Sequence, residues 1–367
     1  MTSNPDSPLP NPSRILIILM GSIGDVVRAL PLLGRLRRNF AAAHIAWVVE
    51  PKSLPIIAGH RWLDEVIVYD RTAPWSFPMV LWQIRKKRFD LVLDLQRHLK
   101  SGVISLASGA RDRIGFNCAN TKEFNHHFNL RQIPLQPPMR LKLTQYQTFG
   151  DALGLPAAPI EFGLEPTDAE QRRAHEFLID APRPLLAVIL GSSWPSRIYF
   201  PESIATVIRR LATPDGDAPA LFPVLLGASD ESTLAAQVVE QLRDVTVLNL
   251  AGRTTLRDLA PILMQCAAAF GPDCGPMHIA AAVGCPIVSL WGSTAPERSA
   301  PWGFAEFALR GEIPCHPCYL RQCPIERECM RRIAPGEVAA TVRKALTLVP
   351  ERIARQSDEP LARRGLA

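Results

Sequence analysis

The strongest constraint on the fold is an alternation of short, β-branched apolar runs with segments of helical periodicity. From Arg14 the runs RILIILM, HIAWVVE, EVIVYD and FDLVLDL follow one another, and we expect helices at about residues 25–39 and 98–108. Parallel sheets are built from such βαβ units, in which a helix connects each strand to the next. The sequence therefore predicts an α/β protein with parallel sheets.

The alternation is interrupted near Ile133 by the proline-rich stretch IPLQPP and resumes at Pro184 with PLLAVILG. The apolar runs that follow are FPVLLG, VTVLNL, AAAFGPD and PIVSLWG, and helices are expected to begin near Pro201, Asp230, Thr255 and Gly275. A chain of 367 residues favours two domains, because single cores stop growing at about 250–300 residues. We expect Rossmann-like domains at residues 14–160 and 161–349, between a disordered tail at 1–13 and a C-terminal tail at 350–367. Ligands bind beyond the carboxyl ends of such strands, so the two domains should face a central cleft.

Composition excludes several classes of protein. Hydrophobic residues make up 47% of the chain and charged residues 21%, as in a globular protein, and no apolar run is long enough to span a bilayer. The first 13 residues lack the basic segment of a secretory signal, and the apolar run after Arg14 ends at Gly21. We therefore expect the chain to remain in the cytoplasm.

The net charge is +6, and the basic residues cluster in the first half. Arg35, Arg37 and Arg38 end one expected helix, and residues 85–88 form a run of four cations. Such clusters suit an anionic partner, although cations at a helix C-terminus are also favourable by themselves. No basic stripe interleaved with aromatic residues and no groove-reading motif accompanies them, so nucleic acid is not an expected partner.

The segment GSIGD, residues 21–25, breaks the first apolar run with two glycines and then places a carboxylate at a helix start. A carboxylate would repel a diphosphate, so the loop is a poor phosphate cradle. One interpretation is a capping box, in which Ser22 and Asp25 close the helix N-terminus. A nicotinamide-binding loop is a further alternative, but the third glycine of its motif is missing, and Glu50 is the one acid placed to bind a ribose.

Three loops after strands of the second half carry polar residues. The segment GSSWPSR offers small hydroxylated residues and a cation, Arg197. Glu231 follows the next strand and is suited either to ribose hydroxyls or to the first turn of a helix. The segment GPDCGPMH places Asp273 and His278 at a helix N-terminus, where unpaired amides form an anion site. Helix capping and core packing would explain these two residues separately, but together they favour a ligand site.

The segments MGSIGDVVRALP, WVVE, DLQRHLKSG, GSSW with R-x-Y-x-P, AGRTTL and DCGPMHIAAAVGCP occur in the order and spacing of a known family. The chain resembles the family 9 glycosyltransferases, most closely the ADP-heptose:lipopolysaccharide heptosyltransferases of the heptosyltransferase I type. The resemblance extends from about Arg14 to Leu348. It implies a GT-B fold, an inverting transfer that needs no metal or other cofactor, an acceptor on the first domain and ADP-heptose on the second.

The resemblance also assigns roles to individual residues. It implies that Asp25 is the catalytic base. Arg197 stands where relatives usually have lysine, and Cys274 replaces their threonine or serine. The implied donor-binding residues are Ser192, Ser193, Arg197, Glu231, Asp273, Cys274, Gly275 and His278. The implied acceptor-binding residues are Gly21, Ser22, Gly24, Asp94, Gln96, Lys100 and Ser101.

Four of the eight cysteines lie in CHPCYLRQCPIEREC. They are Cys315, Cys318, Cys323 and Cys329. Clustered thiols in a cytoplasmic protein suggest a metal before a disulfide framework, although four-thiolate zinc sites usually have two C-x-x-C pairs and only one is present. A structural zinc, an iron–sulfur site and plain reduced thiols all remain open.

The leading hypothesis is therefore an enzyme that moves heptose from ADP-heptose to the Kdo region of lipopolysaccharide, either on Kdo-lipid A or on the growing core. It would work on the inner face of the cytoplasmic membrane, where the basic clusters of its first domain attract anionic lipid. A family 9 enzyme with another nucleotide sugar or core position is the first alternative. A Rossmann oxidoreductase and a non-catalytic metal or redox module built on the cysteines are two further ones.

Overall fold

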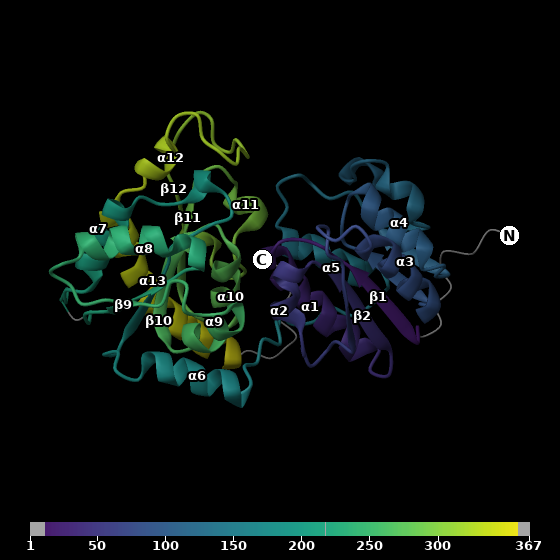
Figure 1. Ribbon diagram of the computed structural model, residues 1–367, viewed down its shortest axis with the longest axis horizontal. Helices are drawn as coiled ribbons and strands as arrows, with labels where there is room; N and C mark the ends of the chain where they lie inside the picture. Colours follow the sequence, from purple (N-terminus) through teal and green to yellow (C-terminus); the bar gives the residue numbers. More distant parts are fainter. Residues whose placement is uncertain (1–11, 217, 359–367) are drawn as a thin grey trace. The chain divides into compact units, whose positions relative to one another are not determined.

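The structure is a computed structural model that describes residues 12–216 and 218–358. The chain divides into two compact units, Met1–Gly163 and Leu164–Ala367. Each unit has its own six-stranded sheet with helices packed against it (Figure 1). The expected α/β class with parallel sheets is confirmed.

The first unit contains a sheet in the order β3-β2-β1-β4-β5-β6, and all of its neighbouring strands are parallel. Its strands are β1 (Arg14–Ile18), β2 (His44–Val49), β3 (Glu65–Val68), β4 (Leu91–Asp94), β5 (Asp112–Gly115) and β6 (Arg131–Gln132). The chain runs outward in one direction from β1 and in the other from β4, so the loops after these two strands lie at the topological switch point. The four expected strands are present, and β5 and β6 are additional.

Helices cover both faces of this sheet. They are α1 (Ile23–Asn39), α2 (Leu54–Ile57), α3 (Ser76–Lys87), α4 (Leu99–Ala107) and α5 (Lys142–Ala152). One core cluster joins Leu16 and Ile18 of β1 to Val80 and Ile84 of α3 and to Ile104 of α4. On the other face α1 packs against α5 (Figure 1). Buried apolar side chains on both faces explain why the central strands read as unbroken hydrophobic runs.

The cations at the end of α1 are not a free surface. Arg35 is 3% exposed and donates to the carbonyls of Gln147, Leu155 and Pro156. Arg37 bonds Asp64, and Arg38 bonds Glu161. These arginines tie α1 to its own unit, and so the expected attraction of this cluster for an outside anion has no structural support.

The second unit repeats the strand order of the first. Its sheet runs β12-β11-β10-β7-β8-β9, again with parallel neighbours, and its switch point lies between β7 and β10. Its strands are β7 (Leu185–Ile189), β8 (Phe222–Leu226), β9 (Leu248–Asn249), β10 (Cys266–Pro272), β11 (Ile287–Trp291) and β12 (Ala308–Arg310). All five expected strands are present, although the one expected at 245–250 is reduced to two residues.

The helices of the second unit start close to the predicted positions. They are α6 (Asp168–Leu178), α7 (Pro201–Leu211), α8 (Ser232–Gln241), α9 (Leu256–Leu263), α10 (Gly275–Ala282), α11 (Pro296–Ser299), α12 (Glu328–Arg331) and α13 (Pro335–Asp358). Helix α13 continues past residue 349, the expected end of the second domain. The expected disordered tail lies mostly outside the described residues, but Ser13 is described and bonds the Asp90 carboxylate. In the described part of the chain no helix combines the length and the apolar character needed to cross a bilayer.

Candidate active site

Asp25 lies in the first turn of α1, directly after the loop that follows β1. Ser22 is the N-cap residue, and Ser22 and Asp25 form both hydrogen bonds of a capping box. The Ser22 hydroxyl also donates to Asp25 Oδ2 at 2.8 Å. A Cβ atom at Gly21 would lie 2.8 Å from Asp25 Cβ, so only glycine fits there. The capping interpretation of the GSIGD segment is thus confirmed in geometry.

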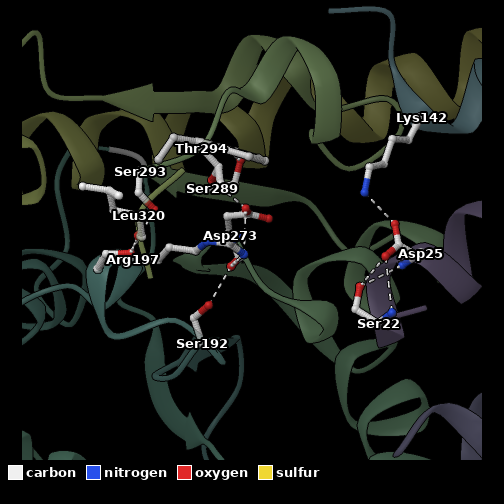
Figure 2. A network of polar contacts seen from close by, with 12 residues as sticks. Ser22, Asp25, Lys142, Ser192, Arg197, Asp273, Ser289, Ser293, Thr294 and Leu320 are labelled. Carbon is white, nitrogen blue, oxygen red and sulfur yellow. Dashed lines mark hydrogen bonds and ion pairs between the residues drawn. The ribbon is translucent and has the colours of Figure 1, made fainter. Parts of the chain in front are cut away.

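Two cations hold the other oxygen of the same carboxylate. Asp25 Oδ1 accepts from Lys142 Nζ at 2.8 Å (Figure 2). It also accepts from Arg28 Nη2 at 2.8 Å. Burial raises the pKa of Asp25, but Lys142 and Arg28 outweigh it and hold this pKa well below the ordinary carboxyl value of 3.8. The Asp25 side chain keeps 18% of its surface exposed. It is therefore an ionised, partly accessible carboxylate at neutral pH.

A second carboxylate, Asp94, ends β4 at the same switch point and is fully buried. Its Oδ2 accepts from Ser101 Oγ at 3.1 Å and from the side-chain amides of Asn125 at 2.8 Å and Asn129 at 3.4 Å. Burial raises the pKa of Asp94 to about 6, although these donors oppose the shift. Asp94 and Ser101, both 0% exposed, therefore position the turn into α4. Direct acceptor binding by these two side chains stays a prediction.

Gln96 and Lys100 lie at the surface of the same turn. The backbone amide of Gln96 donates to Asp94 Oδ1 at 3.1 Å, which fixes the loop after β4. Lys100 Nζ donates to the Tyr69 hydroxyl at 2.6 Å and lies 4.9 Å from the centre of its ring. Lys100 thus presents an oriented cation beyond the carboxyl end of the sheet.

In the second unit, polar groups converge on Asp273, which follows β10 and is 7% exposed. Its Oδ2 accepts from Thr294 Oγ1 at 2.7 Å and pairs with Arg197 Nη1 at 3.1 Å (Figure 2). Its backbone carbonyl accepts from Ser192 Oγ at 2.9 Å. The loops after β7, β10 and β11 therefore meet at one point of the sheet edge.

Arg197 is the cation of this second cluster. Its guanidinium stacks on the Trp194 ring, 4.0 Å from the ring centre, and its side chain is 14% exposed. Stacking and the ion pair with Asp273 together fix its orientation. Ser193, next to Ser192 on the same loop, is exposed. A preoriented arginine beside two serine hydroxyl groups is suited to an anionic ligand.

Glu231 fills the space that a side chain at Gly191 would need. A Cβ atom at Gly191 would lie 1.4 Å from Glu231 Oε1, and one at Gly227 would lie 2.9 Å from Oε2. The amide of Ala228 donates to Oε2 at 2.6 Å. Burial raises the pKa of Glu231, and Asp230 adds to the shift. The carboxyl group is thus held across the ends of β7 and β8, as an acceptor for hydroxyl groups requires.

Helix α10 begins at the same edge. Cys274 is its N-cap residue, with extended backbone, and its thiol makes no capping hydrogen bond. Burial raises the pKa of this thiol far above its usual range, so it is neutral. Gly275 and Pro276 form the first turn, and His278 is 4% exposed. The first amides of α10 therefore lie beside Arg197 and Asp273, although a cysteine replaces the usual hydroxylated cap.

Comparison with known protein families identifies the chain. A model of glycosyltransferase family 9 (heptosyltransferase) matches residues 80–328, which is more than half of the sequence. The chain belongs to glycosyltransferase family 9. This membership excludes the oxidoreductase and the non-catalytic metal module as alternatives.

Individual members of family 9 are similar over most of their length. The chain is 27% identical to lipopolysaccharide heptosyltransferase 1 of Pseudomonas aeruginosa over 370 residues, covering 92% of this chain and 99% of the relative. It is 25% identical to the lipopolysaccharide core heptosyltransferase OpsX of Haemophilus influenzae over 297 residues, covering 79% and 82%. The solved structure of the Escherichia coli heptosyltransferase WaaC with ADP superposes with a TM-score of 0.69 at 20% identity, over 90% of this chain and 99% of that one. This likeness confirms the expected GT-B fold.

Within each unit of this glycosyltransferase, the structure brings together most of the residues that the sequence selected. Sequence reasoning missed the partners that orient them, which are Arg28, Tyr69, Asn125, Asn129, Lys142, Trp194 and Thr294. Arg28 and Trp194 could have been found locally, because each lies three positions from the residue it orients, Asp25 and Arg197. The other partners come from separate elements.

The four clustered cysteines line one small cavity of the second unit together with His316. All are free thiols, from the exposed Cys315 to the buried Cys329. His316 Nδ1 lies 2.6 Å from the carbonyl oxygen of Gly292, while its buried Nε2 has no hydrogen-bond partner. Within the described residues, no three histidine, cysteine, aspartate or glutamate side chains stand in an arrangement that could hold a metal ion. The four thiols line one cavity, but in the described structure they do not surround a common point as metal ligands would.

Proposed function

We propose that this family 9 enzyme transfers heptose from ADP-heptose to the Kdo region of lipopolysaccharide, with inversion at the anomeric carbon and with heptosyltransferase I as the subtype. The observation that carries the proposal is the Asp25 carboxylate, which is held ionised at the switch point of the first sheet. The names of the relatives support the sugar and the lipopolysaccharide acceptor. A different core position or nucleotide sugar is the alternative, because similarities of about a quarter in sequence do not select among subtypes.

The donor would bind to the second unit. The diphosphate would bind to Arg197, to the first amides of α10 and to the hydroxyls of Ser192 and Ser193. Glu231 would accept from the ribose hydroxyls. As the bond from the sugar to ADP breaks, negative charge grows on the diphosphate, and a preoriented guanidinium stabilises it without reorganising. In this scheme a metal ion is not required for the transfer.

The acceptor would bind to the first unit, with its hydroxyl beside Asp25. Gly21, Ser22 and Gly24 allow the backbone to approach it closely, and Gln96 and Lys100 offer polar contacts for an anionic sugar. The acceptor oxygen attacks the anomeric carbon on the face opposite to ADP, so the configuration inverts. Its proton passes to Asp25 while the electrons of the broken bond leave with ADP.

The two cations at Asp25 have opposing effects on this step. By lowering the pKa of Asp25, Lys142 and Arg28 keep the base unprotonated at neutral pH, but they also reduce its basicity. A weak base accepts the proton late, when attack on the anomeric carbon is advanced and the hydroxyl has become acidic. We infer that the pair of cations mainly fixes the geometry and ionisation of Asp25.

We also propose that the cysteine cluster holds a structural zinc ion or an iron–sulfur site. Thiolates suit both, and the buried His316 Nε2, which has no hydrogen-bond partner, lines the same cavity, so the residue types fit although their arrangement is not closed around a metal. The metal site would link the loop that carries Cys315 and Cys318 to α12. Elemental analysis should find zinc or iron bound to the chain, and thiol labelling should then modify Cys118 alone among the exposed and half-buried cysteines. Metal-free protein with four reactive cluster thiols would contradict this.

The enzyme assay tests the main proposal. Purified protein is incubated with ADP-heptose and Kdo-lipid A in detergent, and we expect release of ADP with a mass gain of one heptose. Nuclear magnetic resonance of the product should show the inverted anomeric configuration, and a chelator should leave the rate unchanged. Parallel reactions with other nucleotide sugars and with a heptosylated acceptor separate the alternatives. Folded protein that transfers only in those parallel reactions would refute the assignment.

A further inference from the structure

Helix α3 carries large apolar side chains on its solvent side. Trp75, Met79 and Trp82 are 77%, 57% and 59% exposed, and their spacing places them on one face of the helix. The opposite face supplies Val80 and Ile84 to the core of the first unit. The two tryptophans thus contribute little to the core of the first unit. A solvent-facing helix side with such large apolar side chains indicates an interaction surface.

Cations follow directly along the same helix. Arg85, Lys86 and Lys87 form its last turn, and Arg88 is the next residue. Lys86 Nζ lies 3.8 Å from the centre of the Trp82 ring, and Lys87 pairs with Glu65. Among the described residues, no carboxylate forms an ion pair with Arg85, Lys86 or Arg88. Helix α3 itself contains no acidic residue.

The neighbouring helix extends this surface. Helices α3 and α4 lie side by side in the first unit (Figure 1). The Arg85 guanidinium lies against Gly109, just after α4, where a Cβ atom would be 1.8 Å from Nη1. Leu106 of α4, one turn earlier, is 51% exposed. Carboxylates on adjacent segments have other partners: Glu65 pairs with Lys87, Asp70 bonds Thr72 and Asp90 bonds Ser13.

We propose that this face of α3 docks on an anionic phospholipid bilayer. Trp75, Met79 and Trp82 would lie at the level of the headgroups, which tryptophan prefers, and Arg85, Lys86 and Arg88 would bind lipid phosphates. The inference rests on the proposed function in one respect, since a lipid-anchored acceptor would bring the enzyme to such a surface.

Charge distinguishes a bilayer from a second copy of the chain. A symmetric dimer through this face would bring the same cations of both copies together, which is unfavourable. An anionic surface instead satisfies the apolar and the basic residues at once. Of the two basic clusters expected to attract anionic lipid, the one at residues 85–88 on α3 remains the candidate, because Arg35, Arg37 and Arg38 bond groups of their own unit.

Vesicle co-sedimentation of the full chain tests the proposal. We expect binding to vesicles that contain phosphatidylglycerol, little binding to phosphatidylcholine alone, and weaker binding as salt increases. The double variant Trp75→Gln, Trp82→Gln should lose at least about 10-fold in partitioning, because each ring loses its apolar burial. The variant Arg85→Gln, Lys86→Gln should lose about as much and should lose its salt dependence. Matched controls in the second unit, Trp302→Gln and Arg243→Gln, should bind like the wild type.

Two further measurements keep the outcome decisive. Every variant should retain its thermal melting point and its transfer rate on detergent-dispersed acceptor, since none touches the candidate site. Wild-type protein that fails to bind anionic vesicles at low salt, or α3 variants that bind like the controls, would overturn the proposal. So would a sedimentation-equilibrium dimer that the tryptophan variant converts to monomer without any vesicle binding. Vesicle binding without transferase activity would refute the proposed function and leave the docking surface standing.

Discussion

Lys142 Nζ lies 2.8 Å from Asp25 Oδ1, although the two residues are 117 positions apart in the chain. The contact exists because α5 packs against α1 and places its first residue beside the first turn of α1. It turns a helix-capping carboxylate into a group that is ionised at neutral pH, at the switch point of the sheet. The capping role and the proposed catalytic role of Asp25 are therefore compatible, since one oxygen serves the cap and the other the cations.

Replacing Lys142 should move the acid limb of the pH–rate profile. Lys142 lowers the pKa of Asp25, so Lys142→Met should raise it, and kcat/KM should fall at a higher pH than in the wild type. The wild-type enzyme should show no loss from this group above the ordinary value of 3.8. The matched variant Lys52→Met removes a lysine paired with Glu50 and should leave the profile unchanged. Identical profiles for all three proteins would remove Lys142 from the mechanism.

Removing the Asp25 charge should affect turnover and stability together. Asp25→Asn should lose about 10²-fold or more in turnover, because the base is gone. It should also lower the free energy of unfolding by about 1–3 kcal/mol, because Arg28, whose side chain is 7% exposed, loses its carboxylate partner. Asp151→Asn is the control, because Asp151 pairs with the buried Arg35 and lies outside the candidate site. Asp151→Asn should lose less stability than Asp25→Asn and should keep normal turnover. An Asp25→Asn protein with normal turnover would show that Asp25 serves only as a helix cap.

The buried Asp94 should make the enzyme less stable as the pH rises. Its folded-state pKa of about 6 lies above the ordinary 3.8, so the native state keeps this proton to a higher pH than the unfolded chain does. Its contribution to the free energy of unfolding should therefore fall by on the order of 3 kcal/mol between about pH 4 and pH 6, and should stay constant at higher pH. Denaturant unfolding of the wild type and of Asp94→Asn should be measured across this pH range. The effect of Asp94 is the pH-dependent part of the difference between their free energies of unfolding. A difference that does not change with pH would show that Asp94 titrates normally.

The stacked arginine should determine donor affinity. Arg197→Gln should raise KM for ADP-heptose by about 10-fold or more, because a charge-assisted contact to the diphosphate is lost. Arg197→Lys keeps the charge but not the stacking on Trp194, so its KM should be intermediate. Steady-state kinetics with varied donor measures both, and Arg209→Gln, which breaks a surface pair with Asp244, is the control. Equal KM values in Arg197→Gln and wild type would place the diphosphate elsewhere.

The central strands could be predicted from the sequence because they are buried on both faces and therefore carry continuous apolar runs. Strands β5 and β6 carry no such pattern, although β3, at the other edge of the same sheet, does. Strand β5 (Asp112–Gly115) has the sequence DRIG, and β6 consists of two exposed residues, so their pairing partners alone make them strands. The residue types at the loops after β1, β7, β8 and β10 were also predictable, because a parallel sheet must present its carboxyl-terminal loops on one edge.

Burial and partners at the site could not be predicted in the same way. The DLQRHLKS segment shows a carboxylate and a serine near a turn, but their enclosure depends on Asn125 and Asn129, which arrive from another loop. Arg35, Arg37 and Arg38 look like a solvated helix end, yet the carbonyls that accept from Arg35 lie more than 100 positions away. Local periodicity contains no information about such distant partners.

The contact between Gly191 and Glu231 limits how sequences of this type can diverge. With Oε1 occupying the place of a Cβ atom, a side chain at position 191 would have to displace the Glu231 side chain. The two positions belong to successive strand-end loops. A residue larger than glycine at position 191 would therefore move the Glu231 carboxyl group away from the ends of β7 and β8, so we expect the two positions to change together.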